Sequence, residues 1–410
     1  MSDLKTAYVA NRFPRWGGGW VANEVRGLTA AGVDLDIYSF KPPFPEVVGQ
    51  EGVRESIERT TYVPRGSSRR CLSAALRCLL RNPLGFFRGL STALRLGGRM
   101  ARGAHIGEVF FLADGIRRSG ARHIHAQHAD YLADAAMAAA ACLRLPFSLT
   151  GHANDLYTNP GRLKEKIRAA SFIATCTGFN EAYLKGILEP DQAAKVARVY
   201  HGVDLARFAP RPAGSAPPPP ERLVTVTRLK EKKGFPWLLE AVALLAGRGR
   251  DVTLDIYGDG DRKDAIVALV NQLGLGRRVS LKGAIEHEKI PQALAGAGLF
   301  VLPCVVLPNQ DRDGIPNTII EALASGVPVV STAISGIPEA VRDGVSGLLV
   351  PERDAPALAD AVDRMLSDAE LRSRCAAAGR RIAEENFSIE ASGRSLAGLF
   401  RRGPGSQAAR

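Results

Sequence analysis

A proline-rich run divides the chain into two stretches of similar character. Residues 209–220 read Ala-Pro-Arg-Pro-Ala-Gly-Ser-Ala-Pro-Pro-Pro-Pro. Proline lacks the amide that a helix interior or a sheet ladder requires, so the run predicts a surface linker. A chain of 410 residues is too long for one hydrophobic core and suits two domains. We predict domains at 1–208 and 221–385, and a C-terminal helix within 386–410 that packs back on the first domain and ends in a disordered tail.

Short apolar segments alternate with helix-like segments on both sides of the linker. Such alternation is typical of a parallel sheet with helices on both faces. The predicted strands are 6–10, 33–38, 123–126, 147–150, 172–175, 196–200, 223–227, 252–257, 279–281, 299–303 and 327–331. The predicted helices include 20–31, 131–143, 236–246, 263–273, 316–324 and 355–366. The fold class is therefore α/β, with two doubly wound Rossmann-like domains that bind ligands in the crevice between them.

Charge and cysteine usage limit the partners and the compartment. The net charge of +12 implies an acidic partner such as phosphates, nucleic acid or an anionic lipid face. The six cysteines are scattered without a CxxC pair, which favours free thiols in a reducing cytosol. The N-terminus shows no signal-peptide core, and no apolar run is long enough to span a bilayer. We expect a cytoplasmic protein, with surface attachment to a membrane left open.

A basic stretch runs from Arg65 to Arg102 and contains nine arginines and no acidic residue. Leucine and phenylalanine residues are interleaved with the arginines. A basic amphipathic helix of this kind can lie on an anionic membrane, here the inner face of the cell membrane. An ordinary helix with an arginine-rich polar face explains the pattern equally well, and both readings stay open. Pro83 and the Gly97-Gly98 pair are expected to divide the stretch into shorter helices.

A basic turn follows the first predicted strand of the second domain and reads Arg228-Leu-Lys-Glu-Lys-Lys233-Gly234. A strand end that leads into a helix places such side chains near the positive helix N-terminus. Two cations five residues apart suit a diphosphate, because arginine pairs with phosphate oxygens in a fork and lysine adds a point charge. A solvated basic turn is the alternative reading.

The segment from Asp313 to Glu321 is more informative. Pro316 suits the first position of a helix, so that Gly314 and Ile315 present backbone amides at its N-terminus. Glu321 follows among apolar residues, where a carboxylate is costly unless it is hydrogen-bonded. Sugar hydroxyls are suitable donors to it. The alternative is a salt-bridged glutamate on an exposed helix face.

These residues carry a family resemblance. The second domain resembles that of the family 4 retaining glycosyltransferases with the GT-B fold, in particular the branch for exopolysaccharides of the colanic-acid type. The matching motifs in the second domain are Thr227-Arg228-Leu229, Lys233-Gly234-Phe235, Tyr257-Gly258-Asp259-Gly260, Leu302-Pro303-Cys304, the run from Asp313 through Glu321, and Ser335-Gly336-Ile337-Pro338-Glu339. The first domain matches more loosely through Phe13-Pro14, Asn23-Glu24, Thr150-Gly151-His152-Ala-Asn-Asp155 and His201-Gly202-Val203-Asp204.

The resemblance implies roles for particular residues. Arg228 and Lys233 stand where the family binds and stabilises the departing donor diphosphate. Glu321 stands at the second acid of the family's E-x7-E motif, which binds the nucleotide ribose. Asp313 takes the place of the first acid, usually Glu, which faces the donor sugar. Asp is one methylene shorter, so the reach of this carboxylate to the sugar is altered.

The first domain also provides candidates. His152 corresponds to the histidine that approaches the donor sugar in many members. Gly18 and Gly19 belong to a glycine-rich loop that borders the donor phosphates and acceptor in the family. The branch usually has a Ser-Glu-Thr-Phe-like run where this chain has Gly17-Gly-Gly-Trp20.

No cofactor or metal is expected besides a UDP- or GDP-linked sugar donor, because cations take the place of Mg²⁺ in family members of this kind. His123, His125 and His128 are interpreted as structural rather than as zinc ligands, since no set of ligands at suitable spacing accompanies them. The implied function is retaining transfer of a sugar to a glycan or lipid-linked acceptor in cell-surface polysaccharide biosynthesis.

Two alternatives remain. A nucleotide-sugar epimerase or a soluble sugar-phosphate synthase would share the GT-B fold. A basic, non-catalytic nucleic-acid-binding protein would need a recognisable module, and none is visible.

Overall fold

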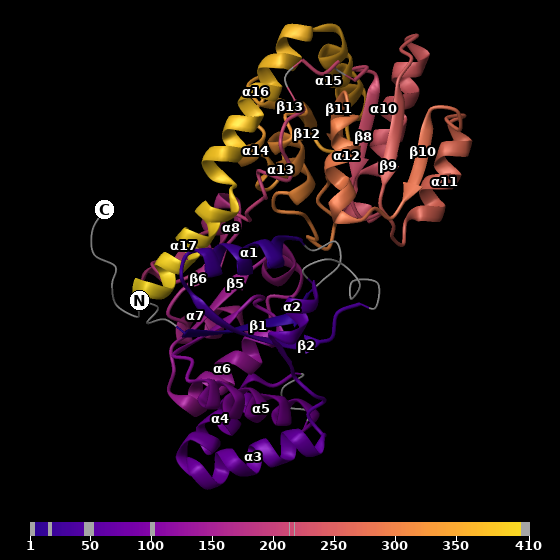
Figure 1. Ribbon diagram of the computed structural model, residues 1–410. Helices are drawn as coiled ribbons and strands as arrows, with labels where there is room; N and C mark the ends of the chain where they lie inside the picture. The colour runs from indigo at the N-terminus through magenta and orange to yellow at the C-terminus, as the bar shows by residue number, and fades with distance from the viewer. Residues whose placement is uncertain are drawn as a thin grey trace. The chain divides into compact units, whose positions relative to one another are not determined.

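The computed structural model describes residues 5–14, 19–44, 53–98, 103–212, 214–216 and 218–402. The chain divides into two compact units (Figure 1). The first unit runs to Tyr200 and includes the C-terminal helix, and the second spans His201–Ile389. The second unit thus begins before the proline-rich run. It does so because Val203 pairs with Ser388 and because Arg380 donates hydrogen bonds to the carbonyls of residues 205 and 208.

A seven-stranded parallel sheet forms the centre of the first unit. Its strand order is β3-β2-β1-β4-β5-β6-β7. The strands are β1 Lys5–Arg12, β2 Asp34–Lys41, β3 Thr60–Tyr62, β4 His123–Ala126, β5 Phe147–Gly151, β6 Ile173–Thr175 and β7 Val196–Arg198. The central strands are buried on both faces, which explains why their sequences are continuous apolar runs rather than alternating ones.

Helices cover both faces of this sheet. They are α1 Gly19–Ala30, α2 Val53–Glu58, α3 Arg69–Arg81, α4 Pro83–Leu96, α5 Gly103–Ser119, α6 Tyr131–Leu143, α7 Leu163–Ala169, α8 Gly178–Ile187, α9 Pro190–Ala193 and α17 Ile389–Arg402. Helices α5 and α6 contribute to the core on one face, and α1 and α17 to the core on the other. Helices α3 and α4 pack on α5 and α6 and form an outer layer (Figure 1). The helix break at Pro83 is confirmed, since α3 ends at Arg81.

Helix α17 packs back on the first unit through close contacts. A Cβ atom added to Gly393 of α17 would lie 2.2 Å from the backbone of Gly27 in α1, so α1 and α17 approach closely. Further along α17, Phe400 lies in the same apolar cluster as Tyr8 and Phe172. The tail predicted after this helix lies outside the described residues.

The second unit contains a six-stranded parallel sheet in the order β10-β9-β8-β11-β12-β13. Its strands are β8 Arg222–Val226, β9 Thr253–Tyr257, β10 Val279–Gly283, β11 Leu299–Leu302, β12 Val329–Thr332 and β13 Gly347–Val350. Its helices are α10 Phe235–Gly247, α11 Lys263–Gln272, α12 Ile290–Ala295, α13 Asn317–Ala324, α14 Ile337–Ala340, α15 Ala355–Ser367 and α16 Ala369–Asn386. Helix α13 begins at Asn317, because Pro316 has ψ 128° and lies just before the helix rather than in its first turn.

Both sheets reverse their strand order at the first strand. In the first unit β1 pairs with β2 on one side and β4 on the other, and in the second unit β8 pairs with β9 and β11. Loops that leave two such strands diverge to opposite faces and open a crevice at the carboxyl ends. The predicted α/β class with two doubly wound domains is confirmed, whereas a cleft between the domains stays a prediction. None of the described helices combines the length and hydrophobicity needed to cross a bilayer.

Candidate active site

The loop after β8 carries the predicted diphosphate ligands of the second unit. Arg228 is exposed, and among the described residues no hydrogen bond or ion pair engages its guanidinium. Lys233 is buried and ends a 3-10 turn, Glu231–Lys233. Gly234 follows at φ 73°, where a Cβ atom would lie 1.8 Å from the carbonyl oxygen of Pro303. Glycine is therefore required to bring this turn against the end of β11.

A second glycine motif supports the same loop from the neighbouring strand. A Cβ atom on Gly258 would lie 1.8 Å from the carbonyl oxygen of Thr227. The amide of Leu229 donates a 2.9 Å hydrogen bond to the carbonyl of Asp259. The Tyr-Gly-Asp-Gly motif thus fixes the backbone on either side of Arg228, a role that the sequence did not reveal.

Asp313 lies against two lysines of this turn. Its carboxylate is 2.6 Å from Nζ of Lys233 and 3.4 Å from Nζ of Lys232, which also pairs with Asp311 at 2.8 Å. Burial raises the pKa of Asp313, but the two lysines outweigh it and lower that pKa to about 2. The carboxylate is therefore ionised and neutralises Lys233. A donor diphosphate would compete with Asp313 for this lysine.

The depressed pKa of Asp313 predicts acid sensitivity. A group with a lowered folded-state pKa stabilises the fold above its unfolded pKa, and this contribution is lost as the pH falls through the folded value. Asp313 should add about 2 kcal/mol to the free energy of unfolding at neutral pH. We expect the free energy of unfolding, measured in urea as a function of pH, to be higher for the wild type than for Asp313→Asn at neutral pH. This difference in free energy should narrow below about pH 4. Parallel stability curves for the two proteins would contradict the pairing.

Glu321 is buried in α13, with a relative exposure of 6%. Its Oε1 lies 3.1 Å from Nε2 of His287, and its Oε2 is buried without a hydrogen-bond partner among the described residues. An orphaned buried carboxylate oxygen is costly unless a ligand donates to it. The exposed, surface-paired glutamate is therefore not what the structure shows. His287 lies in a 3-10 turn, His287–Lys289, and no sequence pattern pointed to it.

The start of α13 presents backbone amides. Gly314 and Ile315 precede the helix, and within the described part of the chain no acceptor engages their N–H groups. The α13 N-terminus and these amides together favour an anion.

In the first unit, His152 directly follows β5. Its Nε2 lies 3.0 Å from the carbonyl oxygen of Gln127 and 3.1 Å from the side-chain oxygen assigned to the same residue. A carbonyl oxygen only accepts, so Nε2 carries a proton and the imidazole orientation is fixed. The carboxylate of Asp155 accepts from the amide of His152 at 3.1 Å and contacts Nδ1 of His128 at 3.1 Å. Burial raises the pKa of Asp155, but His128 and His152 reverse this and lower it.

Trp20 packs against His152, with ring centroids 4.6 Å apart. Its ring also lies 5.9 Å from that of His128. Trp20, which lies in the first turn of α1, therefore positions the histidine, a role that the sequence analysis did not assign to it. Gly19 begins α1, and Gly18 lies outside the described residues.

A buried polar network leads to His152 from β1 and α1. Glu24 accepts hydrogen bonds from the hydroxyl of Tyr8 at 2.7 Å and from the amide of Gln127 at 3.1 Å. Burial raises the pKa of Glu24, although Tyr8 and Gln127 oppose the shift. Gln127 contacts both Glu24 and His152, so the network orients the imidazole. Neither Tyr8 nor Gln127 was singled out from the sequence.

The three histidines that the sequence analysis interpreted as structural occupy two different surroundings. His123 and His125 are buried and contact the hydroxyl of Ser148 at 2.6 and 2.8 Å. Burial lowers the pKa of His123 to about 4. His128 instead pairs with Asp155 beside the candidate site.

The contact between Trp20 and His152 makes a prediction about activity. Trp20→Ala should lower kcat/KM by about ten- to a hundredfold, because the imidazole loses the ring that packs against it and keeps only its hydrogen bonds to Gln127. Trp20→Phe keeps a ring at this place and should retain most of the activity. Steady-state kinetics of the two variants, with melting temperatures as the control for folding, decide the point. Equal losses in both variants would argue against a positioning role.

The protein has two doubly wound α/β units. In the second unit, cations, backbone amides before a helix and a buried carboxylate follow the carboxyl ends of the strands, which is typical of a nucleotide-binding α/β domain. Residues 209–382 match the family described as Glycosyl transferases group 1. The chain therefore contains a glycosyltransferase group 1 domain, and the resemblance that the sequence showed for the second domain is confirmed.

Individual relatives point the same way. The chain is 38% identical over 208 residues to the colanic acid biosynthesis glycosyltransferase WcaL of Escherichia coli, covering 50% of this chain and 51% of that protein. It is 33% identical over 208 residues to a GDP-mannose-dependent alpha-(1-6)-phosphatidylinositol monomannoside mannosyltransferase of Mycolicibacterium smegmatis, covering 48% and 54%. The chain thus matches about half the length of these relatives.

A solved structure covers more of the chain. Anabaena HepE in complex with UDP and glucose aligns over 97% of this chain and 99% of its own, with a TM-score of 0.71 and 17% identity. At this identity the likeness concerns the fold.

Proposed function

We propose that the protein is a retaining glycosyltransferase that moves a sugar from a nucleotide-sugar donor to a glycan or lipid-linked acceptor in cell-surface polysaccharide biosynthesis. The second unit would bind the donor, and the first unit would contribute His152 and the acceptor side. No metal is assigned to the reaction, because Arg228, Lys233 and the amides before α13 are available to neutralise the diphosphate.

One observation carries the proposal. Within the matched domain, Glu321 is buried and its Oε2 has no hydrogen-bond partner among the described residues. A pair of adjacent hydroxyls, such as those of a ribose, would satisfy that oxygen. The lysine turn and the α13 N-terminus then suit the phosphates that follow the ribose in a nucleotide sugar.

The residues suggest how transfer would proceed. Charge develops on the diphosphate as the glycosidic bond stretches, and Arg228, Lys233 and the amides of Gly314 and Ile315 would stabilise it. The acceptor hydroxyl would attack the same face of the sugar and lose its proton to the departing phosphate. Asp313 would release Lys233 to the donor, and its freed carboxylate would then be available to sugar hydroxyls.

The competing functions receive less support. Both relatives named above are glycosyltransferases by their names, and one acts on a phosphatidylinositol mannoside by its name. That lipid acceptor, together with the basic stretch, supports a lipid-linked acceptor and an anionic membrane surface as partners. A cytoplasmic protein that attaches peripherally to the inner face of the cell membrane would meet both.

A thermal-shift screen of nucleotides and nucleotide sugars tests the proposal and identifies the donor. A ligand that binds the native state raises the melting temperature by mass action. We expect UDP or GDP and one of their sugar conjugates to raise it, and the product made from that conjugate to keep the anomeric configuration of the donor. The proposal would be refuted if no nucleotide sugar shifted the melting temperature or if the product were inverted.

A further inference from the structure

Helix α3 exposes its large apolar side chains to solvent and buries small ones. The residues that it buries are small: Cys71, Ala74 and Cys78. Leu72, Leu76 and Leu80 recur every fourth residue on the opposite face and are exposed to solvent. Leucine is usually buried when a helix packs in a monomer, so a leucine stripe that points outward marks an interaction surface.

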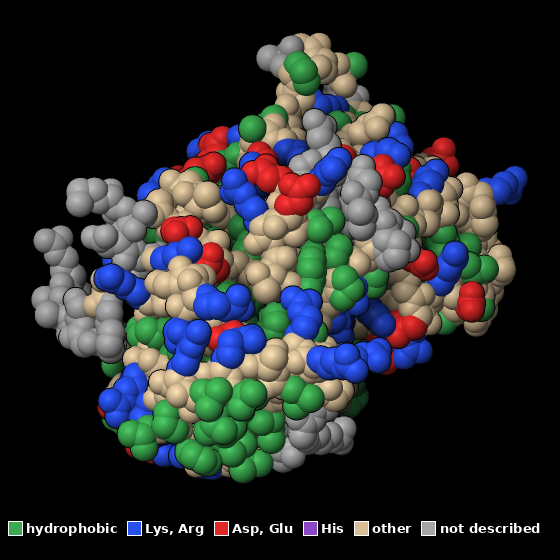
Figure 2. Space-filling view, turned by 60° about the horizontal axis from the view of Figure 1, so that its bottom comes forward, with side chains coloured by type: hydrophobic (Ala, Val, Ile, Leu, Met, Phe, Trp, Pro, Cys, Tyr) green, Lys and Arg blue, Asp and Glu red, His purple; other side chains and the backbone are tan. Residues whose placement is uncertain are grey.

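Helix α4 extends this exposed apolar surface. It packs through Gly85, Gly89 and Ala93, and a Cβ atom on Gly85 would lie 2.4 Å from the carbonyl oxygen of Cys142. The exposed apolar side chains of the two helices, with relative exposures between 51% and 73%, are Leu72, Leu76, Leu80, Leu84, Phe87 and Leu94. We call these six residues the α3–α4 face. Figure 2 shows hydrophobic side chains gathered in this region, with Lys and Arg side chains along the margin.

The chain segment that carries the α3–α4 face has charges of one sign only. No acidic residue occurs between Arg65 and Arg102. Arg69 and Arg81, at the two ends of α3, are exposed, and within the described ranges no acidic residue pairs with either. Arg77 differs, because it forms a 2.8 Å ion pair with the buried carboxylate of Asp114 and so belongs to the fold. The complement of this surface is apolar in its middle and anionic at its edge.

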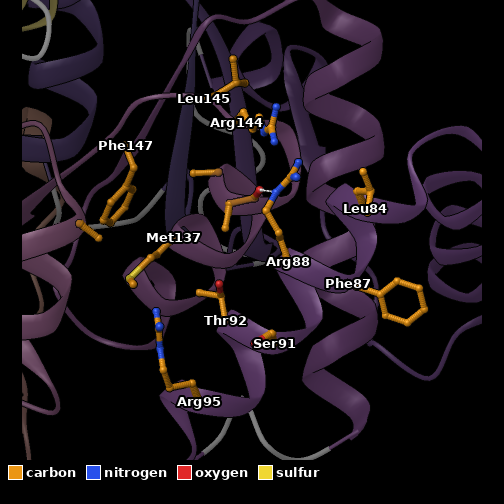
Figure 3. A pocket seen from close by; sticks show the side chains of 13 residues that line it. Leu84, Phe87, Arg88, Ser91, Thr92, Arg95, Met137, Arg144, Leu145 and Phe147 are labelled. Atoms are coloured by element: carbon orange, nitrogen blue, oxygen red, sulfur yellow. Dashed lines mark hydrogen bonds between the residues drawn. The ribbon is translucent and has the colours of Figure 1, made fainter.

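A pocket of about 730 Å³ opens beside the same face. Its wall combines apolar side chains with three arginines and no acidic residue, and Leu84 and Phe87 belong to both the wall and the α3–α4 face. Figure 3 shows the side chain of Arg88 extending toward Arg144, with Arg95 at the other end of the pocket. Two guanidinium groups that converge on an apolar pocket favour a phosphate between them.

The arginines of the pocket are held in different ways. Nε of Arg88 donates a 3.2 Å hydrogen bond to the carbonyl of Ala141, which fixes the position of its guanidinium. Arg95 is paired with Glu165 at 2.9 Å, whereas Arg144 directly follows α6 at φ 56° and is exposed. Arg144 can therefore be changed with little effect on the fold.

We propose that the α3–α4 face docks on an anionic phospholipid bilayer, with the phosphate of one lipid between Arg88 and Arg144 and its chain in the pocket. The inference rests on the proposed membrane partner and names its surface. It does not depend on the sugar chemistry. The pocket reaches Phe147 at the start of β5, whereas His152 follows the other end of that strand, so docking leaves the candidate site of the first unit uncovered.

Vesicle sedimentation of the full chain tests the proposal. With vesicles of equal parts phosphatidylglycerol and phosphatidylcholine we expect the protein to pellet, and with phosphatidylcholine alone to stay in solution. Leu72→Ser/Leu76→Ser/Leu80→Ser and, separately, Arg69→Glu/Arg81→Glu/Arg144→Glu should each lower the partition coefficient at least tenfold. Added salt should weaken binding of the wild type, because the arginine contribution is screened.

Matched changes elsewhere act as the control. Leu244, Val267 and Val345 are also exposed apolar residues, and they lie in the second unit. Leu244→Ser/Val267→Ser/Val345→Ser should bind anionic vesicles like the wild type, with all variants matched in melting temperature. The proposal is overturned if the α3 triple variant pellets like the wild type, or if the wild type ignores anionic vesicles or binds neutral ones equally well.

The same variants separate this surface from the enzyme proposal. Transfer to a water-soluble acceptor should be unchanged in the α3 triple variant, since none of its residues lies in the candidate site. Vesicle binding without any transfer activity would refute the proposed function and leave the docking surface intact. Transfer activity without vesicle binding would refute the docking surface and leave the proposed function intact.

Discussion

Glu321→Ala is expected to lower kcat/KM for the nucleotide-sugar donor by about a hundredfold or more. The buried carboxylate would lose its hydrogen bonds to the ribose hydroxyls, and bonds to a charged group contribute about 1.5–3 kcal/mol each. The loss in kcat/KM should come mainly from a higher KM, because the ribose is remote from the bond that breaks. Steady-state kinetics with the donor found in the thermal-shift screen would measure both constants.

Two controls make the Glu321 result specific. Glu370 is exposed on α16 of the same unit, and Glu370→Ala should leave the kinetics unchanged. Glu321→Ala also loses the 3.1 Å contact between Oε1 and His287, so its melting temperature is measured and the kinetics are compared well below it. Wild-type kinetics in a folded Glu321→Ala variant would show that this residue does not bind the donor.

Lys233→Ala is expected to lower kcat by about a hundred- to a thousandfold, with a smaller change in KM. A preorganised cation that stabilises charge on the leaving group acts most strongly in the transition state, and removal of one such group has this order of effect. Asp313 keeps Lys232 as a partner at 3.4 Å, so the variant should remain folded. Single-turnover measurements would separate the chemical step from donor binding.

An exposed lysine three positions earlier is the matched control for Lys233. Lys230 pairs with Asp261 at the surface, and Lys230→Ala should lose little activity because exposed ion pairs contribute little. If Lys233→Ala kept the wild-type kcat, or if both lysine variants lost activity equally, the leaving-group role of Lys233 would be wrong.

The fold was largely predictable because its signals are local. Buried parallel strands read as continuous apolar runs, and the break at Pro83 needs only the chemistry of proline. The domain boundary was less predictable. Residues 201–208 belong to the second unit through contacts with residues more than 170 positions away, such as Arg380 with Phe208.

The residues of the candidate site were predictable where a single short segment of sequence identifies them. The placement of Lys233 and Glu321 follows from a strand end and a helix start in their own motifs. The partners that define their environment come from elsewhere in the chain. His287 lies in a polar turn without any pattern, and the network of Tyr8, Glu24 and Gln127 joins β1, α1 and the loop after β4.

Asp313 shows how a correct placement can leave the chemistry open. The sequence has an acid at this position, and the family resemblance implied that it faces the donor sugar. The structure pairs that acid with Lys233 and Lys232, an arrangement set by the 3-10 turn and by the loop that follows β11. Donor binding would then exchange one anion for another at Lys233.

Calorimetric titration of a nucleoside diphosphate, UDP or GDP as the screen selects, measures binding at the candidate donor site itself. We expect the diphosphate to bind the wild type and Glu370→Ala with equal affinity. Glu321→Ala and Lys233→Ala should each raise Kd at least tenfold, which corresponds to about 1.4 kcal/mol. An unchanged Kd in both of these variants would contradict a donor site built on Glu321 and the lysine turn.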